Sequence, residues 1–167
     1  MKGLSITEYE GGGWNHIAGT IAQSDMLGIF GTQGLFAASF WPPNGSYDYA
    51  LAGFRAFRGF DGANAKFGDT SVKATSSDVS KVALYASTDT TTPGRVVFVA
   101  INRTKSSLVT AINGMTLSGT ATLYQITATS ASGQSPVHPV NVGTQTASGT
   151  SLKVTLPALS VTTIEVK

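Results

Sequence analysis

Cysteine is absent from the 167 residues, so the chain can form neither disulfides nor thiolate metal sites. Charge is also scarce: 12% of the residues are charged, nine acidic and eleven basic. The basic residues are scattered and form no stripe, which argues against a nucleic-acid-binding surface. No apolar run reaches the about 18 residues that suggest a membrane-spanning helix. His16 and His138 lie far apart with no acid at ligand spacing, so we expect no metal site and no cofactor.

The remaining composition suits a folded protein. Hydrophobic residues make up 41% of the chain, which is enough for a core and too many for a disordered chain. The length fits one large domain, or one domain with a fragment of another. Met1 and Lys2 come directly before the first expected strand, and no long apolar segment follows them. We therefore expect no signal peptide in this chain, and we expect it to be a fragment of a longer protein.

The first sixty residues predict alternating strands and helices. Leu4 to Tyr9 alternate in polarity as in a short strand, which a run of three glycines ends. Asn15 is the expected N-cap of a helix over Ile17 to Phe30, whose apolar residues occur all round and predict burial on more than one side. The apolar run Leu35 to Trp41, bounded by two prolines, predicts a buried parallel strand. Ser46 is the expected cap of a second helix.

The sequence pattern changes after about residue 60. Short runs rich in Val, Ile, Thr and Tyr follow one another, such as "VALYAST", "RVVFVAINRT", "SLVTAING" and "TATLYQITA", with turn segments between them. This pattern predicts an antiparallel β-sandwich of about seven or eight strands. We therefore divide the chain into an α/β segment over residues 1–60 and a β-sandwich domain over residues 61–167.

Glu8 and Trp41 end the two expected parallel strands. Parallel β/α units carry their chemistry at the carboxyl ends of the strands, so the two side chains fall where a site is expected. Taken singly, Glu8 reads as a solvated carboxylate and Trp41 as a core residue. Together they suit a sugar, because the ring can stack on its apolar face and the carboxylate can attack or stabilise the anomeric carbon.

Other candidate sites are weaker. The three glycines before the first helix lack the Gly-Lys-Ser/Thr ending and the spacing of a phosphate-binding loop. Trp14 lies in the same loop. It suits two roles equally well: contact with a sugar, directly or as part of a lid, and packing over an edge of the core. Tyr85, Phe98 and Tyr124 lie on expected strands of the sandwich, where aromatic residues are more often core than a carbohydrate-binding face.

Two segments carry a resemblance to a known family. "ITEYEGGGWNHIAGTIAQSDMLGIFGTQGLFAASFWP" resembles the late part of the (β/α)8 barrel in glycoside hydrolase family 44, a group of bacterial endo-β-1,4-glucanases and xyloglucanases. "YDYALAGFRAFRGFDGANAKFGDTSV" resembles the last barrel helix of that family and its exit into a C-terminal β-sandwich. The resemblance is close over roughly residues 3–75 and covers the rest by architecture.

The resemblance implies roles for several residues. Lys2 to Glu10 would be barrel strand seven and Leu35 to Trp41 strand eight, making the fold a partial TIM barrel followed by a β-sandwich. Glu8 matches the nucleophile of a retaining β-1,4-glucan hydrolase that acts on cellulose- or xyloglucan-type polysaccharides. The substrate-binding residues implied are Trp41 on the floor of the subsite, Tyr9 as wall or support for the carboxylate, and Trp14, Asn15 and His16 in the loop after strand seven. The family resemblance also implies a secreted bacterial enzyme.

The chain departs from the family pattern, because strands one to six and the general acid/base of strand four are missing. Glu10 lies about 6.5–7 Å along the strand from Glu8, on the same side of the sugar, and does not suit the role of the second carboxylate. We therefore expect this chain alone to be inactive, and to associate with the missing barrel part or with itself. The alternative is a non-catalytic β-sandwich module, structural or carbohydrate-binding, with a remnant of a barrel attached.

Overall fold

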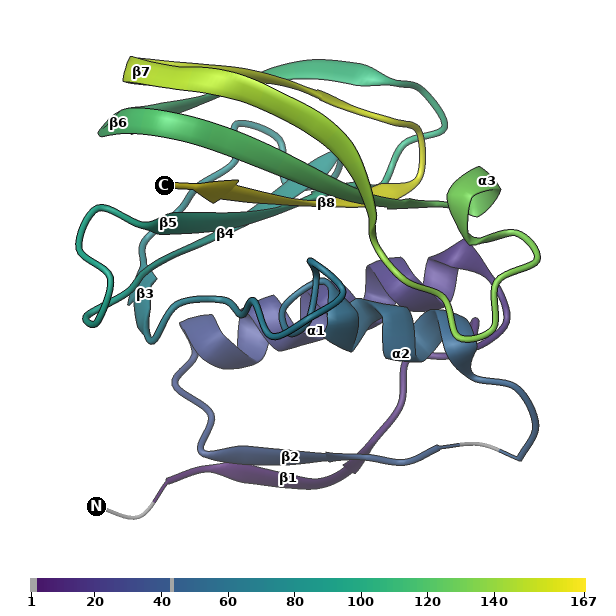
Figure 1. Cartoon of the computed structure of the whole chain (residues 1–167). Helices are drawn as coiled ribbons and strands as arrows, with labels where there is room; N and C mark the ends of the chain where they lie inside the picture. The colour runs from purple at the N-terminus through teal and green to yellow at the C-terminus, as the bar shows by residue number, and fades with distance from the viewer. Residues whose placement is uncertain (1–2, 43) are drawn as a thin grey trace.

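The computed structural model describes residues 3–42 and 44–167, in which two helices lie between a small parallel sheet and a large antiparallel one (Figure 1). The chain begins with strand β1 (Ser5–Tyr9), helix α1 (Ile17–Thr32), strand β2 (Ala37–Phe40) and helix α2 (Asp48–Arg55). The predicted β-α-β-α order is therefore confirmed. Strand β2 is shorter than expected and only half buried, because nothing in the described chain covers its second face. Of the prolines expected to end it, Pro43 lies outside the described residues, as do Met1 and Lys2.

Both predicted helix caps were wrong. His16, not Asn15, precedes α1 in extended conformation, and its Nδ1 accepts the backbone N–H of Ala18 at 3.1 Å. The cap falls one residue later because the backbone N–H of His16 is bonded to the carbonyl of Gly13, which closes the turn there. Helix α2 begins after Tyr47, which makes no side-chain cap, so Ser46 lies one residue too early.

The large sheet contains six strands in the order β3-β4-β5-β8-β6-β7. Their bounds are β3 (Thr70–Val72), β4 (Val82–Thr88), β5 (Val96–Asn102), β6 (Leu108–Thr127), β7 (Val140–Leu156) and β8 (Ser160–Val166), with the short helix α3 (Ala128–Ala131) after β6. The expected seven or eight strands were too many, because two predicted strands are halves of β6. Gly114 and Gly119, both at positive φ, lie inside β6 and let it bend without ending.

The sheet folds over itself. Strands β6 and β7 arch above the other strands (Figure 1), and the side chains between them form one core. That core takes Phe98 from β5, Ile164 from β8, and Ile112, Leu152 and Leu156 from the arching strands. Strand β8 pairs with β5 on one side and β6 on the other, so the last strand is central to the sheet.

The helices pack on the outer face of this sheet. Ile17 of α1 and Phe57 after α2 share a second core with Val99 and Ile101 of β5 and Val161 of β8. Helix α1 is thus covered by strands on both sides, as its all-round apolar pattern predicted (Figure 1). Residues before and after position 60 therefore share a core. The division into domains at residue 60 stays a prediction.

Polar contacts lock the two layers together. Asp25 of α1 accepts the hydroxyl of Tyr85 from β4 at 2.6 Å and pairs with Arg103 at 2.5 Å. Burial, together with Asp25, raises the pKa of Tyr85, so the phenol remains a donor. On the other side of the core, the hydroxyl of Thr163 in β8 donates to the carbonyl of Ala56 at 2.7 Å.

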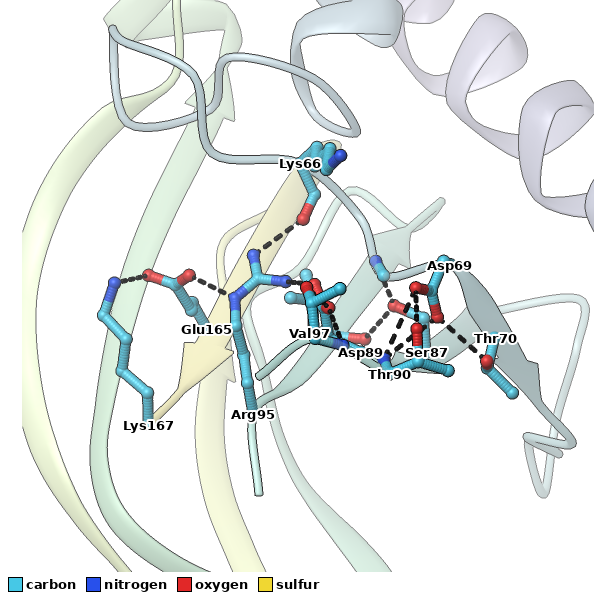
Figure 2. A network of polar contacts seen from close by, with 12 residues as sticks. Lys66, Asp69, Thr70, Ser87, Asp89, Thr90, Arg95, Val97, Glu165 and Lys167 are labelled. Atoms are coloured by element: carbon cyan, nitrogen blue, oxygen red, sulfur yellow. Dashed lines mark hydrogen bonds and ion pairs between the residues drawn. The ribbon is translucent and has the colours of Figure 1, made fainter. Parts of the chain in front are cut away.

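A buried ionic cluster joins three strand ends (Figure 2). The guanidinium of Arg95 donates to Glu165 at 2.8 Å, to Asp89 at 3.0 Å and to the carbonyl of Lys66 at 2.7 Å. Lys167 pairs with the other oxygen of Glu165 at 2.8 Å. Because every charge is matched, the cluster fixes the start of β5 against the end of β8.

Within the described ranges, none of the helices has the length and apolar character needed to cross a membrane.

Candidate functional site

The candidate site begins at an irregularity in β1. Ile6 is paired with Ala38 and Tyr9 with Phe40, so three steps along β1 match two along β2. The extra residue is a β-bulge between Ile6 and Tyr9, and it interrupts the simple alternation that the sequence predicted for this strand. Bulges re-aim side chains and are frequent next to active sites. Here the bulge contains Glu8.

Tyr9 faces the helices. Its ring lies edge-on to Phe30 of α1 at 5.1 Å and to Phe40 of β2 at 5.8 Å, and its hydroxyl accepts the side-chain amide of Gln23 at 2.9 Å. Burial raises the pKa of Tyr9, although the bond from Gln23 lowers it in part. In this structure Tyr9 anchors the end of β1 from behind, and its side chain packs in the helix layer.

Glu8 and Trp41 lie at the carboxyl ends of neighbouring strands. The backbone N–H of Trp41 donates to the carbonyl of Tyr9 at 2.8 Å, which fixes the two strand ends side by side. Glu8 is exposed, and 57% of Trp41 is exposed, whereas the neighbouring Phe40 packs onto Phe54 of α2. An exposed carboxylate and an exposed aromatic residue therefore lie at the carboxyl ends of two paired strands.

The loop after β1 is more ordered than its glycines suggested. One carboxylate oxygen of Glu10 accepts the backbone N–H of Gly12 at 2.9 Å and the indole N–H of Trp14 at 2.8 Å. The carbonyl of Trp14 in turn accepts the N–H of Tyr49 from the first turn of α2 at 3.1 Å. The two bonds from Gly12 and Trp14 hold the carboxylate of Glu10 in place. A carboxylate placed two residues before a glycine is a local signal for such a bond to the backbone.

Asn15 and His16 complete this loop, and both are exposed. The Nδ1 atom of His16 is used in capping α1, which leaves Nε2 for other contacts. Glu8 thus lies within β1, Trp14, Asn15 and His16 lie in the segment between β1 and α1, and Trp41 directly follows β2.

The aromatic residues of the large sheet contribute to packing. Phe98 is buried, Tyr85 contacts Asp25, and the ring of Tyr124 lies 5.3 Å from that of buried Phe60. A cavity of about 260 Å³ lies elsewhere, between the two helices, and is lined by Leu27, Phe54, Phe57, Arg58, Lys66 and Phe67. Across residues 3–42 and 44–167, no group of three or more His, Asp or Glu side chains could hold a metal ion.

Comparison with known proteins gives a consistent result, although no family model matches the chain. Endoglucanase A of Paenibacillus lautus is 38% identical over 100 residues, covering 60% of this chain and 14% of that protein. A family 44 endoglucanase from Clostridium thermocellum superimposes over 99% of this chain and 32% of its own, with a TM-score of 0.88 and 30% identity. A family 44 xyloglucanase from Paenibacillus polymyxa, solved with xyloglucan, has a TM-score of 0.90 and 27% identity over the same shares.

The resemblance to glycoside hydrolase family 44 is confirmed. The agreement extends over nearly the whole chain, including the large sheet, which the sequence had matched by architecture only. The chain spans about a third of the length of these family 44 structures and a seventh of the curated endoglucanase.

Proposed function

We propose that this chain is the C-terminal portion of a retaining, endo-acting β-1,4-glucan hydrolase, with Glu8 as the nucleophile. The observation that carries the proposal is the position of Glu8. It is exposed within a bulge at the carboxyl end of a parallel strand, and the neighbouring strand ends next to the exposed Trp41, whose backbone is bonded to Tyr9. β1 and β2 would then be strands seven and eight of a TIM barrel whose remaining strands complete the site, and the large sheet would be its C-terminal sandwich domain.

The proposed substrate is a cellulose- or xyloglucan-type polysaccharide. The ring of Trp41 would hold one sugar by stacking. Glu8 would attack its anomeric carbon to form a glycosyl-enzyme ester while the glycosidic bond breaks, and the departing sugar oxygen would take a proton from the general acid of the missing barrel part. Asn15 and His16 lie in the adjoining loop and could contact sugar hydroxyls through the exposed amide and Nε2. Such polymers are too large to enter a cell, so we expect the whole enzyme to be secreted.

A retaining hydrolase needs a second carboxyl group about 5–5.5 Å from the nucleophile, across the scissile bond. Glu10 does not suit that role, because its carboxylate is engaged by the loop and belongs to the same strand end as Glu8. We therefore expect this chain alone not to hydrolyse glucans, since general acid/base assistance is worth about 10²–10⁴-fold and correct positioning more.

The decisive experiment traps the nucleophile. The chain is joined in one polypeptide to the barrel portion that precedes the matched region in a family 44 relative, and is incubated with a 2-deoxy-2-fluoro cello-oligosaccharide carrying a good leaving group. We expect mass spectrometry to find the label on Glu8. Glu8→Gln should abolish both labelling and reducing-sugar release from xyloglucan, with an unchanged circular dichroism spectrum because the two side chains are nearly isosteric.

A label on another residue would count against the proposal. Turnover by the 167-residue chain alone that disappears in Glu8→Gln would contradict the expectation that the chain is inactive by itself. The alternative, a non-catalytic module, predicts that the joined protein binds polysaccharide without labelling or hydrolysis. The aromatic side chains of the large sheet named above pack inward and give that alternative no stacking surface of their own.

A further inference from the structure

The carboxylate of Glu10 fixes an aromatic side chain beside the proposed catalytic strand. Its two bonds, to the N–H of Gly12 and to the indole of Trp14, close the loop over four residues. Charge-assisted bonds of this kind are roughly twice as strong as neutral ones. A third bond, from Tyr49 to the carbonyl of Trp14, ties the same residue to α2.

The glycines of the loop allow its backbone to follow this tight path against α1. Gly12 and Gly13 both have positive φ, near +69° and +63°. A Cβ on Gly13 would lie 2.8 Å from the N atom of Gly19, and a Cβ on Gly19 would lie 2.2 Å from the carbonyl oxygen of Gly13. The backbone of the loop is therefore packed closely against the first turn of α1 at Gly13 and Gly19.

We infer that Glu10 is a positioning residue, which holds Trp14 as a second aromatic wall for the glucan chain. The inference rests on the proposed function and extends it to a residue with no assigned role. The indole N–H of Trp14 is already bonded to Glu10, so the ring meets a substrate through its apolar surface. Trp14 thus recognises the CH face of a pyranose ring and contributes no hydrogen bond to a hydroxyl group.

The clamp can be tested in the chain by itself, because it contains two tryptophans. In a Trp41→Phe background the only fluorophore of its kind is Trp14. Glu10→Ala should raise the acrylamide quenching constant by about twofold and lower the emission anisotropy, since the ring loses its anchor. Glu10→Gln should stay near the parent value, because its amide oxygen can accept the same two bonds. Glu8→Gln, at the same strand end, is the matched control and should change neither quantity.

The role in positioning substrate is tested in the joined polypeptide described above. With xyloglucan, Glu10→Ala should raise KM by about tenfold and leave kcat within about twofold, the signature of a lost uniform binding interaction. Glu10→Gln should have a KM close to that of the parent protein. Unchanged quenching in Glu10→Ala would refute the clamp. Unchanged KM, or a fall in kcat alone, would refute its role toward substrate. Failure of the Glu8 labelling would refute the catalytic proposal and leave the fluorescence result standing.

Discussion

At the scale of single residues, local environment separates side chains that look alike in the sequence. Glu8 and Glu10 lie two residues apart, yet Glu8 is exposed, while Glu10 accepts the two hydrogen bonds that hold the loop closed. Glu165 is a third case, since its carboxylate is buried and matched by Arg95 and Lys167. Three carboxylates thus have three distinct positions: open, locally bonded and buried in an ion pair.

The buried cluster leads to a stability prediction at this scale. Arg95→Met should destabilise the chain by about 3 kcal/mol, the low end for a broken buried pair, because it leaves the buried carboxylate of Glu165 with Lys167 as its remaining partner. Urea unfolding followed by circular dichroism measures the change. The control is Lys81→Met, which removes a solvent-exposed ion pair with Asp78 and should have a much smaller effect on stability. Equal effects of the two substitutions would contradict the assigned importance of burial.

At the scale of elements, helix α1 is the part that both layers share. It packs through Gly28 against the ring of Tyr85 in the large sheet, and through Phe30 against Tyr9 of the small sheet. Helix α2 approaches it closely at Gly53, where a Cβ would lie 2.6 Å from that of Gln23. Small residues therefore set how near the helix comes to the large sheet and to its neighbouring helix.

Two glycines of α1 provide a matched pair of substitutions. Gly28→Ala should destabilise by about 1–3 kcal/mol, because its Cβ would fall 2.3 Å from the ring of Tyr85 and force α1 away from the sheet. Gly31→Ala meets nothing within 4 Å and should stabilise by about 0.5–1 kcal/mol through helix propensity. Thermal unfolding midpoints of both variants provide the test, and a stabilising Gly28→Ala would show that the contact with Tyr85 is loose.

At the scale of the whole molecule, the small sheet is the incomplete part. Among the described residues β1 and β2 pair only with each other, so each has a free edge. Leu4 is 75% exposed and Phe36 80% exposed at the amino ends of the two strands, and Trp41 is 57% exposed at the carboxyl end of β2. Such edges and apolar faces favour association with further strands. Ile6, which is paired with Ala38, is half buried.

We expect the chain by itself to associate, either with the remaining barrel or with further copies. Burial of each large side chain contributes about 1.5–3 kcal/mol, which favours contact between these faces. Size exclusion with light scattering should find species larger than 17.2 kDa, and the double substitution Leu4→Lys and Phe36→Lys should shift them toward monomer. A parent chain that is monomeric at high concentration would show that the two strands need no cover.

Much of the architecture followed from sequence patterns that depend on near neighbours. Hydrophobic periodicity predicted two strands and two helices in order, and the all-round apolar pattern of Ile17 to Phe30 predicted a helix covered on more than one side. The paired motifs identified the family resemblance, which the comparisons confirmed. Glu8 and Trp41 were selected as site candidates because they end the two expected parallel strands. Their functional roles remain proposals.

Other features were decided by contacts between distant segments. The sequence could not show that β6 continues through its glycines. The strand can bend there and continue because the distant strand β7 pairs with it on both sides of the irregularity between Asn113 and Leu117. It placed Tyr9 with the site, whereas the bulge in β1 turns the ring into the helix layer, where Gln23 and Phe30 meet it. The role of Glu10 likewise depends on the folded loop, because a carboxylate accepts hydrogen bonds only from donors that the fold brings within about 3 Å.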